Sequence, residues 1–199
     1  MTADREARPT VCRCVASTIG RRALLGVGTS VGIGLVAPAS AQSDASRIRP
    51  QEGDLLVRAD STDLVPLTPQ SLPSDGFPMM AFPYDPAAKL VRNGSRLNKI
   101  LVQRLEPSGL NEPTAQRAAE GVVAYSAICP HAGCDVSVWV AEQKIFECSC
   151  HYSHYDPREG AAVIDGPAPR ALAALPLKVA DGKLVVAKPF TARVGIVPT

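Results

Sequence analysis

The sequence has little net charge, few histidines and no internal repeat or low-complexity tract. Its 199 residues include 21 basic and 19 acidic side chains, which give a formal net charge of +2. Residues 1–41 carry five arginines and two acidic residues, so the remainder is close to neutral. So balanced a chain lacks the basic surface that binds nucleic acid, and no nucleic-acid partner is expected. The 158 residues after position 41 suit one domain with a hydrophobic core.

Eighteen prolines argue against long helices, because proline breaks a helix interior. The pattern of apolar and polar residues predicts an all-β fold whose short strands are joined by turns. The expected strands cover residues 54–58, 98–105, 122–128, 136–140, 144–147, 162–164, 175–179 and 184–187. Asp181-Gly182, between the last two, predicts a tight hairpin. One brief helix is expected at Pro113–Glu120, with Asn111 as its N-cap and Gly121 as its stop.

Cysteine and histidine are concentrated in two short motifs, Cys129-Pro-His131-Ala-Gly-Cys134 and Cys148-Ser-Cys150-His151. The inner spacings are Cys-x-His and Cys-x-x-His, and sixteen residues separate His131 from Cys148. Each motif can form a loop tip that offers one sulfur and one nitrogen. Two such tips facing each other would enclose two metal ions, and two cysteines would be left over. The donor set therefore fits a binuclear iron–sulfur cluster.

Histidine ligands change the charge of such a cluster. Two ferric ions, two sulfides and two thiolates sum to zero, whereas four thiolates would leave two negative charges, so an electron enters the mixed-ligand cluster more easily. Centres of this type have potentials of about −150 to +300 mV, against about −400 mV for plant-type ferredoxins. The same donors could hold zinc instead. A structural zinc module is the non-redox alternative, although it would leave Cys134 and Cys150 without a role.

These motifs resemble Rieske iron-sulfur proteins, and the resemblance covers about residues 121–187. It implies a Rieske-type antiparallel β base domain at 54–199, with an inserted cluster-binding subdomain at about 127–169. It also implies one [2Fe-2S] cluster per chain. By resemblance, the thiolate ligands are Cys129 and Cys148, and the imidazole ligands are His131 and His151.

The resemblance also assigns residues around the cluster. Cys134 and Cys150 correspond to a disulfide that ties the two loops together, and two buried free thiols are the alternative. Ser153 and Tyr155 match positions whose hydroxyls donate hydrogen bonds to a bridging sulfide and to a ligand sulfur, which raises the potential. The Gly-Pro-Ala-Pro segment at 166–169 resembles the proline loop that covers the cluster in quinol-oxidising members.

Some positions depart from the family pattern. Ser149 and Tyr152 stand where the second loop usually has proline and glycine, and Ala132 stands where quinol-oxidising members commonly carry leucine. Residues 81–85 and 122–128 look more like the small subunit of arsenite oxidase. Two interpretations therefore remain open: the iron-sulfur subunit of a quinol:cytochrome c reductase (ubiquinol-cytochrome c reductase-like), and the small electron-transfer subunit of an arsenite-oxidase-type molybdoenzyme.

Under either interpretation, the resemblance implies a high-potential electron-transfer subunit of a respiratory oxidoreductase complex, not catalytic alone. Expected partners are a cytochrome b or a molybdenum subunit and a cytochrome c-type acceptor. All three histidines lie near the motifs, so no pair remains for the separate mononuclear iron of a Rieske oxygenase, which two histidines and a carboxylate would bind. His154 is expected to be an exposed bystander, because ligation by it would break the Cys-x-x-His spacing.

The amino terminus predicts where the protein works. Gly20-Arg21-Arg22-Ala23-Leu24-Leu25 resembles a twin-arginine export signal, and residues 23–43 carry no charge. Ala39-Ser40-Ala41 fits an A-x-A cleavage site. Residues 1–41 are therefore expected to be a twin-arginine signal or, if retained, an inner-membrane anchor, since the run is just long enough to cross a bilayer. Residues 42–53 are expected to be a polar linker, and the head is expected to be periplasmic.

Overall fold

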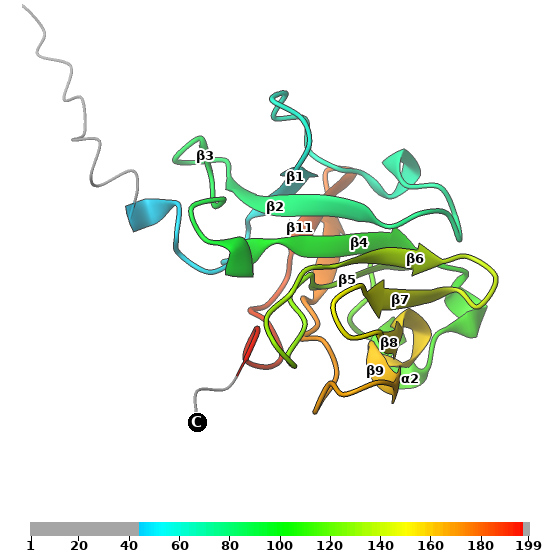
Figure 1. Cartoon of the computed structure of the whole chain (residues 1–199). Coiled ribbons are helices and arrows are strands. Elements are labelled where there is room, and N and C mark those ends of the chain that lie inside the picture. The colour runs from blue at the N-terminus through cyan, green and yellow to red at the C-terminus, as the bar shows by residue number, and fades with distance from the viewer. Residues whose placement is uncertain (1–43, 197–199) are drawn as a thin grey trace, which may run out of the picture. The chain divides into compact units, whose positions relative to one another are not determined.

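The computed structural model describes residues 44–196, which form two antiparallel β-sheets (Figure 1). The first sheet has seven strands in the order β10-β11-β1-β2-β4-β5, and β3 pairs with β2. Its strands are β1 (Leu55–Arg58), β2 (Met79–Asp85), β3 (Leu90–Val91), β4 (Ile100–Arg104), β5 (Val122–Ser126), β10 (Leu177–Ala180) and β11 (Lys183–Val186). The second sheet has the order β6-β7-β8-β9. Its strands are β6 (Val136–Val140), β7 (Ile145–Cys148), β8 (Ser153–Asp156) and β9 (Ala162–Asp165).

The four-stranded sheet is an insertion in the seven-stranded one. Strands β6 to β9 lie in the chain between β5 and β10, which both belong to the first sheet. We call the first sheet the base domain and the second the cluster subdomain. The all-β class and the inserted subdomain expected from the sequence are confirmed. Within residues 46–196 the helical segments are all short: α2 (Glu112–Ala115) and the 3-10 turns η1 (Pro69–Ser71), η2 (Arg96–Asn98), η3 (Pro107–Gly109) and η4 (Pro157–Glu159).

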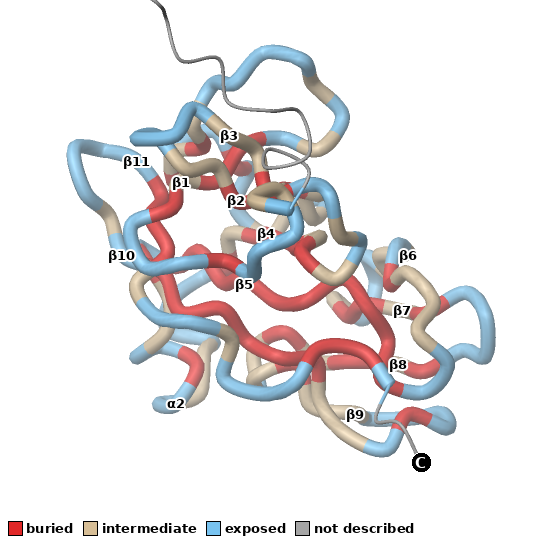
Figure 2. Tube along the Cα trace, turned by 90° about the vertical axis from the view of Figure 1, so that its left-hand side faces the viewer, coloured by how far each residue is buried: buried red, intermediate tan, exposed pale blue. Residues whose placement is uncertain are grey.

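Strands β4 and β5 are buried on both faces, because their side chains alternate between two cores. Leu101 and Tyr125 point into the core shared with the cluster subdomain, where Phe146 packs. Ile100 and Val102 point to the opposite core, inside the base domain. Figure 2 shows the buried backbone as a red stretch through the centre of the molecule. The cluster subdomain therefore rests on strands β4 and β5 of the base domain.

The hairpin expected at Asp181-Gly182 is confirmed. β10 and β11 pair antiparallel, with Ala180 opposite Lys183 at the turn. Asp181 and Gly182 have φ angles of 50° and 72°, as the two central residues of a type I′ turn require. This hairpin closes the edge of the base domain far along the chain from the Cys/His motifs.

The expected helix at Pro113–Glu120 is wrong in length. The structure has a single turn, Glu112–Ala115, although Asn111 caps it as expected. It ends early because the backbone of Ala119 pairs with Val122 on the way into β5. A helix continued to residue 120 would break that pairing.

The sequence interpretation also missed β2, β3 and β8. β2 contains Pro83, and a proline inside an apolar run argues against a strand. Within β2, only Met79–Ala81 pair with β4, so Pro83 lies beyond the end of β4 and costs no hydrogen bond to that strand. β8 has the polar sequence Ser-His-Tyr-Asp and pairs with β7 on one side and β9 on the other. Its membership in the sheet depends on these partners rather than on its own propensity.

Residues 44–53, within the expected linker, hydrogen bond to the base domain. The Asn98 side chain donates to the Ile48 carbonyl at 2.7 Å, and Arg49 donates to the Leu97 carbonyl at 2.8 Å. The segment before β1 is thus held against η2. Residues 1–43, with the export motif and the Ala-Ser-Ala site, lie outside the described residues. Within 44–196, no helix is long and apolar enough to cross a bilayer.

Candidate metal centre

Two neighbouring loops of the cluster subdomain carry the Cys/His motifs. The first ligand loop, residues 129–134, leads from β5 into β6, and the second, residues 148–152, leads from β7 into β8. The Cys129 N–H donates to the Cys134 carbonyl at 2.8 Å, which closes the first loop. In the second loop, the Tyr152 N–H donates to the Cys148 carbonyl at 2.9 Å. Backbone hydrogen bonds therefore hold each motif as a tight tip.

The thiols of Cys129 and Cys148 are buried and interact with each other. Each residue is 1% exposed. Burial raises the pKa of the Cys148 thiol, and the neighbouring Cys129 raises it further. The Tyr155 hydroxyl lies 3.1 Å from Cys129 Sγ. Ligation deprotonates a thiol, so both cysteines would be thiolates in the metal-bound state. Two neighbouring buried thiolates need a metal cation to offset their charge.

The imidazoles of His131 and His151 meet edge to face. Their ring centroids lie 4.6 Å apart, with an angle of 86° between the planes. Both residues are exposed, whereas the two cysteines beside them in the motifs are buried. The sulfur donors therefore lie inside the subdomain and the nitrogen donors lie at its surface.

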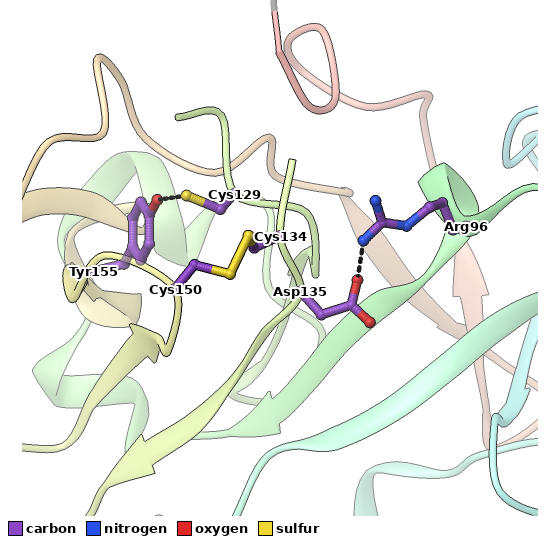
Figure 3. Close-up of a disulfide and its surroundings, with 6 residues drawn as sticks. All are labelled: Arg96, Cys129, Cys134, Asp135, Cys150 and Tyr155. Atoms are coloured by element: carbon purple, nitrogen blue, oxygen red, sulfur yellow. Dashed lines mark hydrogen bonds and ion pairs between the residues drawn. A yellow bond between two sulfur atoms is a disulfide. The ribbon is translucent and has the colours of Figure 1, made fainter. Parts of the chain in front are cut away.

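Cys134 and Cys150 form a disulfide that joins the two ligand loops (Figure 3). This confirms the expected pairing and excludes two free thiols. The sulfur of Cys148 lies within 4.8 Å of both disulfide sulfurs. These three sulfurs do not make a metal site, because a disulfide sulfur has no thiolate charge. Their closeness shows instead that the disulfide lies directly against the second ligand loop.

The arrangement of the four candidate ligands, with two buried sulfurs and two exposed imidazoles, suits a binuclear cluster. Among the described residues, Cys134, Cys148 and Cys150 form the only set of three metal-binding side chains whose donor atoms lie within 4.8 Å of one another. Of the four candidate ligands, this set contains only Cys148. A [2Fe-2S] cluster needs only the two sulfurs on one iron and the two nitrogens on the other.

Ser153 connects the second ligand loop to the expected proline loop. It is fully buried, its Oγ accepts the Ala168 N–H at 3.2 Å, and its hydroxyl interacts with the Tyr155 phenol. Gly166 has a φ of 90°, and a Cβ added there would lie 2.5 Å from the Ser153 Cα. The Gly-Pro-Ala-Pro segment therefore packs directly against the second ligand loop, as the resemblance implied for a covering loop.

Tyr152 occupies a backbone position that favours glycine. Its φ is 56°, in the left-handed region, where a side chain is strained. The glycine that the family resemblance led us to expect here would adopt this φ without strain, whereas tyrosine adopts it at a cost. The side chain is 65% exposed, next to His151. Tyr152 therefore adds an aromatic surface beside the imidazoles, where Ala132 of the first loop adds almost none.

The expectation that His154 is exposed is wrong. Its side chain is 23% exposed, and its Nε2 lies 2.8 Å from a carboxylate oxygen of Glu147. The two residues are cross-strand partners in β7 and β8. Only recognition of β8 as a strand could have predicted this pair, because nothing in the sequence spacing links them. The contact occupies one ring nitrogen of His154 with a carboxylate, on strands that lead away from the ligand loops.

Two tight Cys/His loops on an antiparallel β insertion, joined by a disulfide, define an iron–sulfur protein of mixed sulfur and nitrogen ligation. Residues 110–176 match the family model described as Rieske [2Fe-2S] domain. The chain therefore carries a Rieske domain, and its cofactor is a Rieske-type [2Fe-2S] cluster. The matched range contains both ligand loops and the proline loop.

Known relatives show how far the likeness extends. A Streptomyces lividans cytochrome bc1 complex Rieske iron-sulfur subunit is 40% identical over 83 residues, 41% of this chain and 49% of that protein. A Haloferax mediterranei protein, named for a Rieske subunit of a respiratory nitrate reductase, is 38% identical over 97 residues, 48% of this chain and 43% of that one. The chain thus spans less than half of each of these relatives. The solved ferredoxin of carbazole 1,9a-dioxygenase from Nocardioides aromaticivorans is 22% identical, with a TM-score of 0.41, over 71% of this chain and 99% of that one.

Proposed function

We propose that the chain is the high-potential electron-transfer subunit of a respiratory complex similar to quinol:cytochrome c reductase. In this proposal Cys129 and Cys148 bind one iron of the cluster, and His131 and His151 bind the other. The observation that carries it is the edge-to-face pair of exposed imidazoles, with centroids 4.6 Å apart, beside two buried thiols. When bound, the cluster supplies a one-electron acceptor.

The buried side chains around the thiols exclude water, and the Tyr155 hydroxyl can donate a hydrogen bond to the Cys129 sulfur. Phe146, Ser153 and Tyr155 are each 0% exposed. Donation from the Tyr155 hydroxyl to the Cys129 sulfur is worth more when that sulfur is more electron-rich, so it favours the reduced state. The exposed imidazoles each keep one ring nitrogen for a partner, because ligation uses the other. The protein thus supplies a dry sulfur side and an accessible nitrogen side.

The surface around the imidazoles supports docking to an uncharged partner. Residues 129–134, 148–152 and 166–169 contain no aspartate, glutamate, lysine or arginine. Such a face suits an apolar pocket such as a quinol site in a cytochrome b, with a cytochrome c-type protein as the acceptor. The likeness to cytochrome bc1 Rieske subunits supports the same assignment.

A second candidate is the small electron-transfer subunit of an arsenite-oxidase-type molybdoenzyme. Two observations favour it. Ala132 gives the first ligand loop little apolar surface for a quinol pocket. One relative is named for a nitrate reductase rather than for a cytochrome bc1 complex. In that setting the chain would take no part in quinol oxidation and would only relay electrons from the molybdenum subunit to a cytochrome c-type acceptor.

The proposal includes export by the twin-arginine route to the periplasm. That route carries folded proteins, so a cluster assembled in the cytosol can travel inside its fold. The disulfide that joins the ligand loops also suits an oxidising compartment. Arg21-Arg22 and the Ala-Ser-Ala site in the sequence support this location. Cell fractionation and the intact mass of the native protein would distinguish a cleaved signal from a retained inner-membrane anchor.

The cluster assignment is tested by comparing histidine variants. We expect the purified native chain to contain two irons and two sulfides and to give the EPR signal of a Rieske centre after reduction. Cys129→Ser and His151→Ala should each lose the cluster. His154→Ala is the matched control, because it removes the third histidine and should keep the cluster. A colourless wild-type chain that binds zinc, prepared from iron-replete cells, would refute the assignment.

The complex is tested by purification of the native protein from membranes and periplasm. Co-purification with a cytochrome b, and reduction of the cluster by a quinol, would support the first candidate. Co-purification with a molybdenum subunit, without reduction by quinol, would support the second.

A further inference from the structure

The end of the first ligand loop is tied to the base domain by two ion pairs. Asp135, the residue after the disulfide Cys134, accepts from Arg96 Nη2 at 2.7 Å through Oδ1 and from Lys99 Nζ at 2.5 Å through Oδ2. Figure 3 shows the Arg96 contact beside the disulfide. Each carboxylate oxygen thus has its own cation, and both cations come from η2 and its cap in the base domain.

The same base-domain segment also holds the other end of the loop. The Lys99 carbonyl accepts the Ala127 N–H at 3.0 Å, on the chain that enters the loop. Ala127 in turn accepts from the Val136 N–H at 2.8 Å, on the chain that leaves it. Residues 96–99 therefore contact the chain on both sides of the first ligand loop, at Ala127 before it and at Asp135 after it.

Segment 96–99 is itself fixed. Asn98 is 0% exposed, and its side chain donates to the carbonyls of Ile48 and Arg92 at 2.7 and 3.0 Å. A rigid segment can hold the first ligand loop in one position, whereas a mobile segment could not. The exposed fractions of the Lys99 and Asp135 side chains are 26% and 33%, so this pair is only partly screened by water.

We propose that Arg96 and Lys99 are positioning residues that hold the first ligand loop through Asp135 and offset the charge of its carboxylate near the cluster. This rests on the proposed function, since the position of the loop matters to electron transfer only if Cys129 and His131 bind the cluster. Without the two cations, the loop would open more often and an uncompensated negative charge would disfavour the added electron.

The test uses the cluster-loaded chain and measures amide hydrogen exchange at Ala127 and Val136 together with the midpoint potential. In Arg96→Met/Lys99→Met, both amides should exchange roughly fivefold faster, which corresponds to the largest stabilisation measured for partly exposed ion pairs. The midpoint potential should fall. Asp135→Asn should speed exchange similarly but raise the potential, because it removes a negative charge. The triple variant should exchange no faster than Asp135→Asn, since the three residues act through one contact.

Lys144→Met is the matched control. Lys144 also joins the cluster subdomain to the base domain, through Asp75 at 2.8 Å, but from the β6–β7 turn rather than from a ligand loop. It should leave the potential at the wild-type value, and once each variant's loss of global stability is subtracted it should speed exchange at the two amides less than Arg96→Met/Lys99→Met does. Unchanged exchange in Arg96→Met/Lys99→Met, fully additive effects in the triple variant, or an equal response in Lys144→Met would overturn the proposal. Exchange at the two amides does not depend on cluster chemistry, so a failed cluster assignment would show separately in the iron and sulfide content.

Discussion

Two buried tyrosines of the shared core illustrate how single residues take different roles. The hydroxyl of Tyr155 lies 3.1 Å from the Cys129 sulfur, whereas the hydroxyl of Tyr125 donates to the Pro157 carbonyl at 2.7 Å. Burial raises the pKa of the Tyr155 phenol well above its usual range, and the nearby Cys129 raises it further. A phenol whose pKa is raised in this way favours its protonated form, which can donate to the Cys129 sulfur as the family resemblance implies.

Tyr155→Phe should lower the midpoint potential and leave the cluster bound. Loss of one hydrogen bond to a charged sulfur, worth about 1 kcal/mol more in the reduced state, corresponds to about 40 mV for one electron. Protein-film voltammetry would measure the shift, and iron analysis would confirm occupancy. Tyr125→Phe is the control, since it also removes a buried hydroxyl but should leave the potential unchanged. Equal potentials in all three proteins would show that Tyr155 does not donate to the cluster.

At the level of elements, the site depends on the contact between the second ligand loop and the proline loop. Gly166 lies so close to Ser153 and to the Tyr152 carbonyl that a Cβ would fall 2.5 Å and 2.7 Å from their nearest atoms. Only glycine fits this contact at a φ of 90°. The sequence predicted a turn at Gly-Pro-Ala-Pro, but the backbone contact that requires its glycine is with Ser153 and Tyr152, thirteen and fourteen positions earlier in the chain.

Gly166→Ala should destabilise the chain more than Gly182→Ala. Both glycines have positive φ, so each substitution incurs left-handed strain of about 1–2 kcal/mol. Gly182 has no atom within 4 Å of an added Cβ, whereas Gly166 would also clash with loop backbone, which adds about 1–3 kcal/mol. Denaturant unfolding of both variants would measure the difference. Equal losses would mean that the proline loop can move away freely.

At the scale of the whole molecule, the cluster subdomain is joined to the base domain by a shared core and by ion pairs at both ends. Leu101 and Tyr125 of the base domain pack with Phe146 of the subdomain. Asp135 ties one end to the base domain, and Lys144 ties the other to Asp75. The hydrogen bond from Lys144 lowers the pKa of Asp75 despite partial burial. A depressed carboxyl pKa stabilises the fold at neutral pH and ceases to do so in acid.

Lys144→Met should therefore cost stability at neutral pH and not in acid. The loss should be at most about 1 kcal/mol, because the pair is partly exposed. The contribution of Asp75 is present above its ordinary pKa of 3.8 and disappears as pH falls below that value toward the lowered folded one. Urea unfolding of wild type and variant from pH 7 to pH 3 would show the two curves converging. A constant difference across that range would assign the effect to something other than Asp75.

Sequence patterns correctly predicted the elements that have strong local signals. They failed for elements whose structure depends on pairing with neighbouring strands. The hairpin at Asp181-Gly182 and most strands were found because turn chemistry and alternation are local. β2 and β8 were missed, since Pro83 and a polar Ser-His-Tyr-Asp run have weak strand propensity of their own and pair because neighbours flank them. The helix was overextended for the same reason, because the Ala119–Val122 pairing ends it.

The sequence by itself determined which donor atoms are available for the cluster. The motifs Cys-x-His and Cys-x-x-His and the additional cysteine pair are the same whether or not the chain is folded. Tertiary structure decided everything that depends on separation in space. It buried the thiols and exposed the imidazoles, joined Cys134 to Cys150, brought Tyr155 to the Cys129 sulfur, and set Arg96 and Lys99 against Asp135. These contacts join residues far apart in the chain. Strand pairing within the cluster subdomain brings together its two ligand loops and Tyr155, and packing of this subdomain on the base domain brings Asp135 to Arg96 and Lys99.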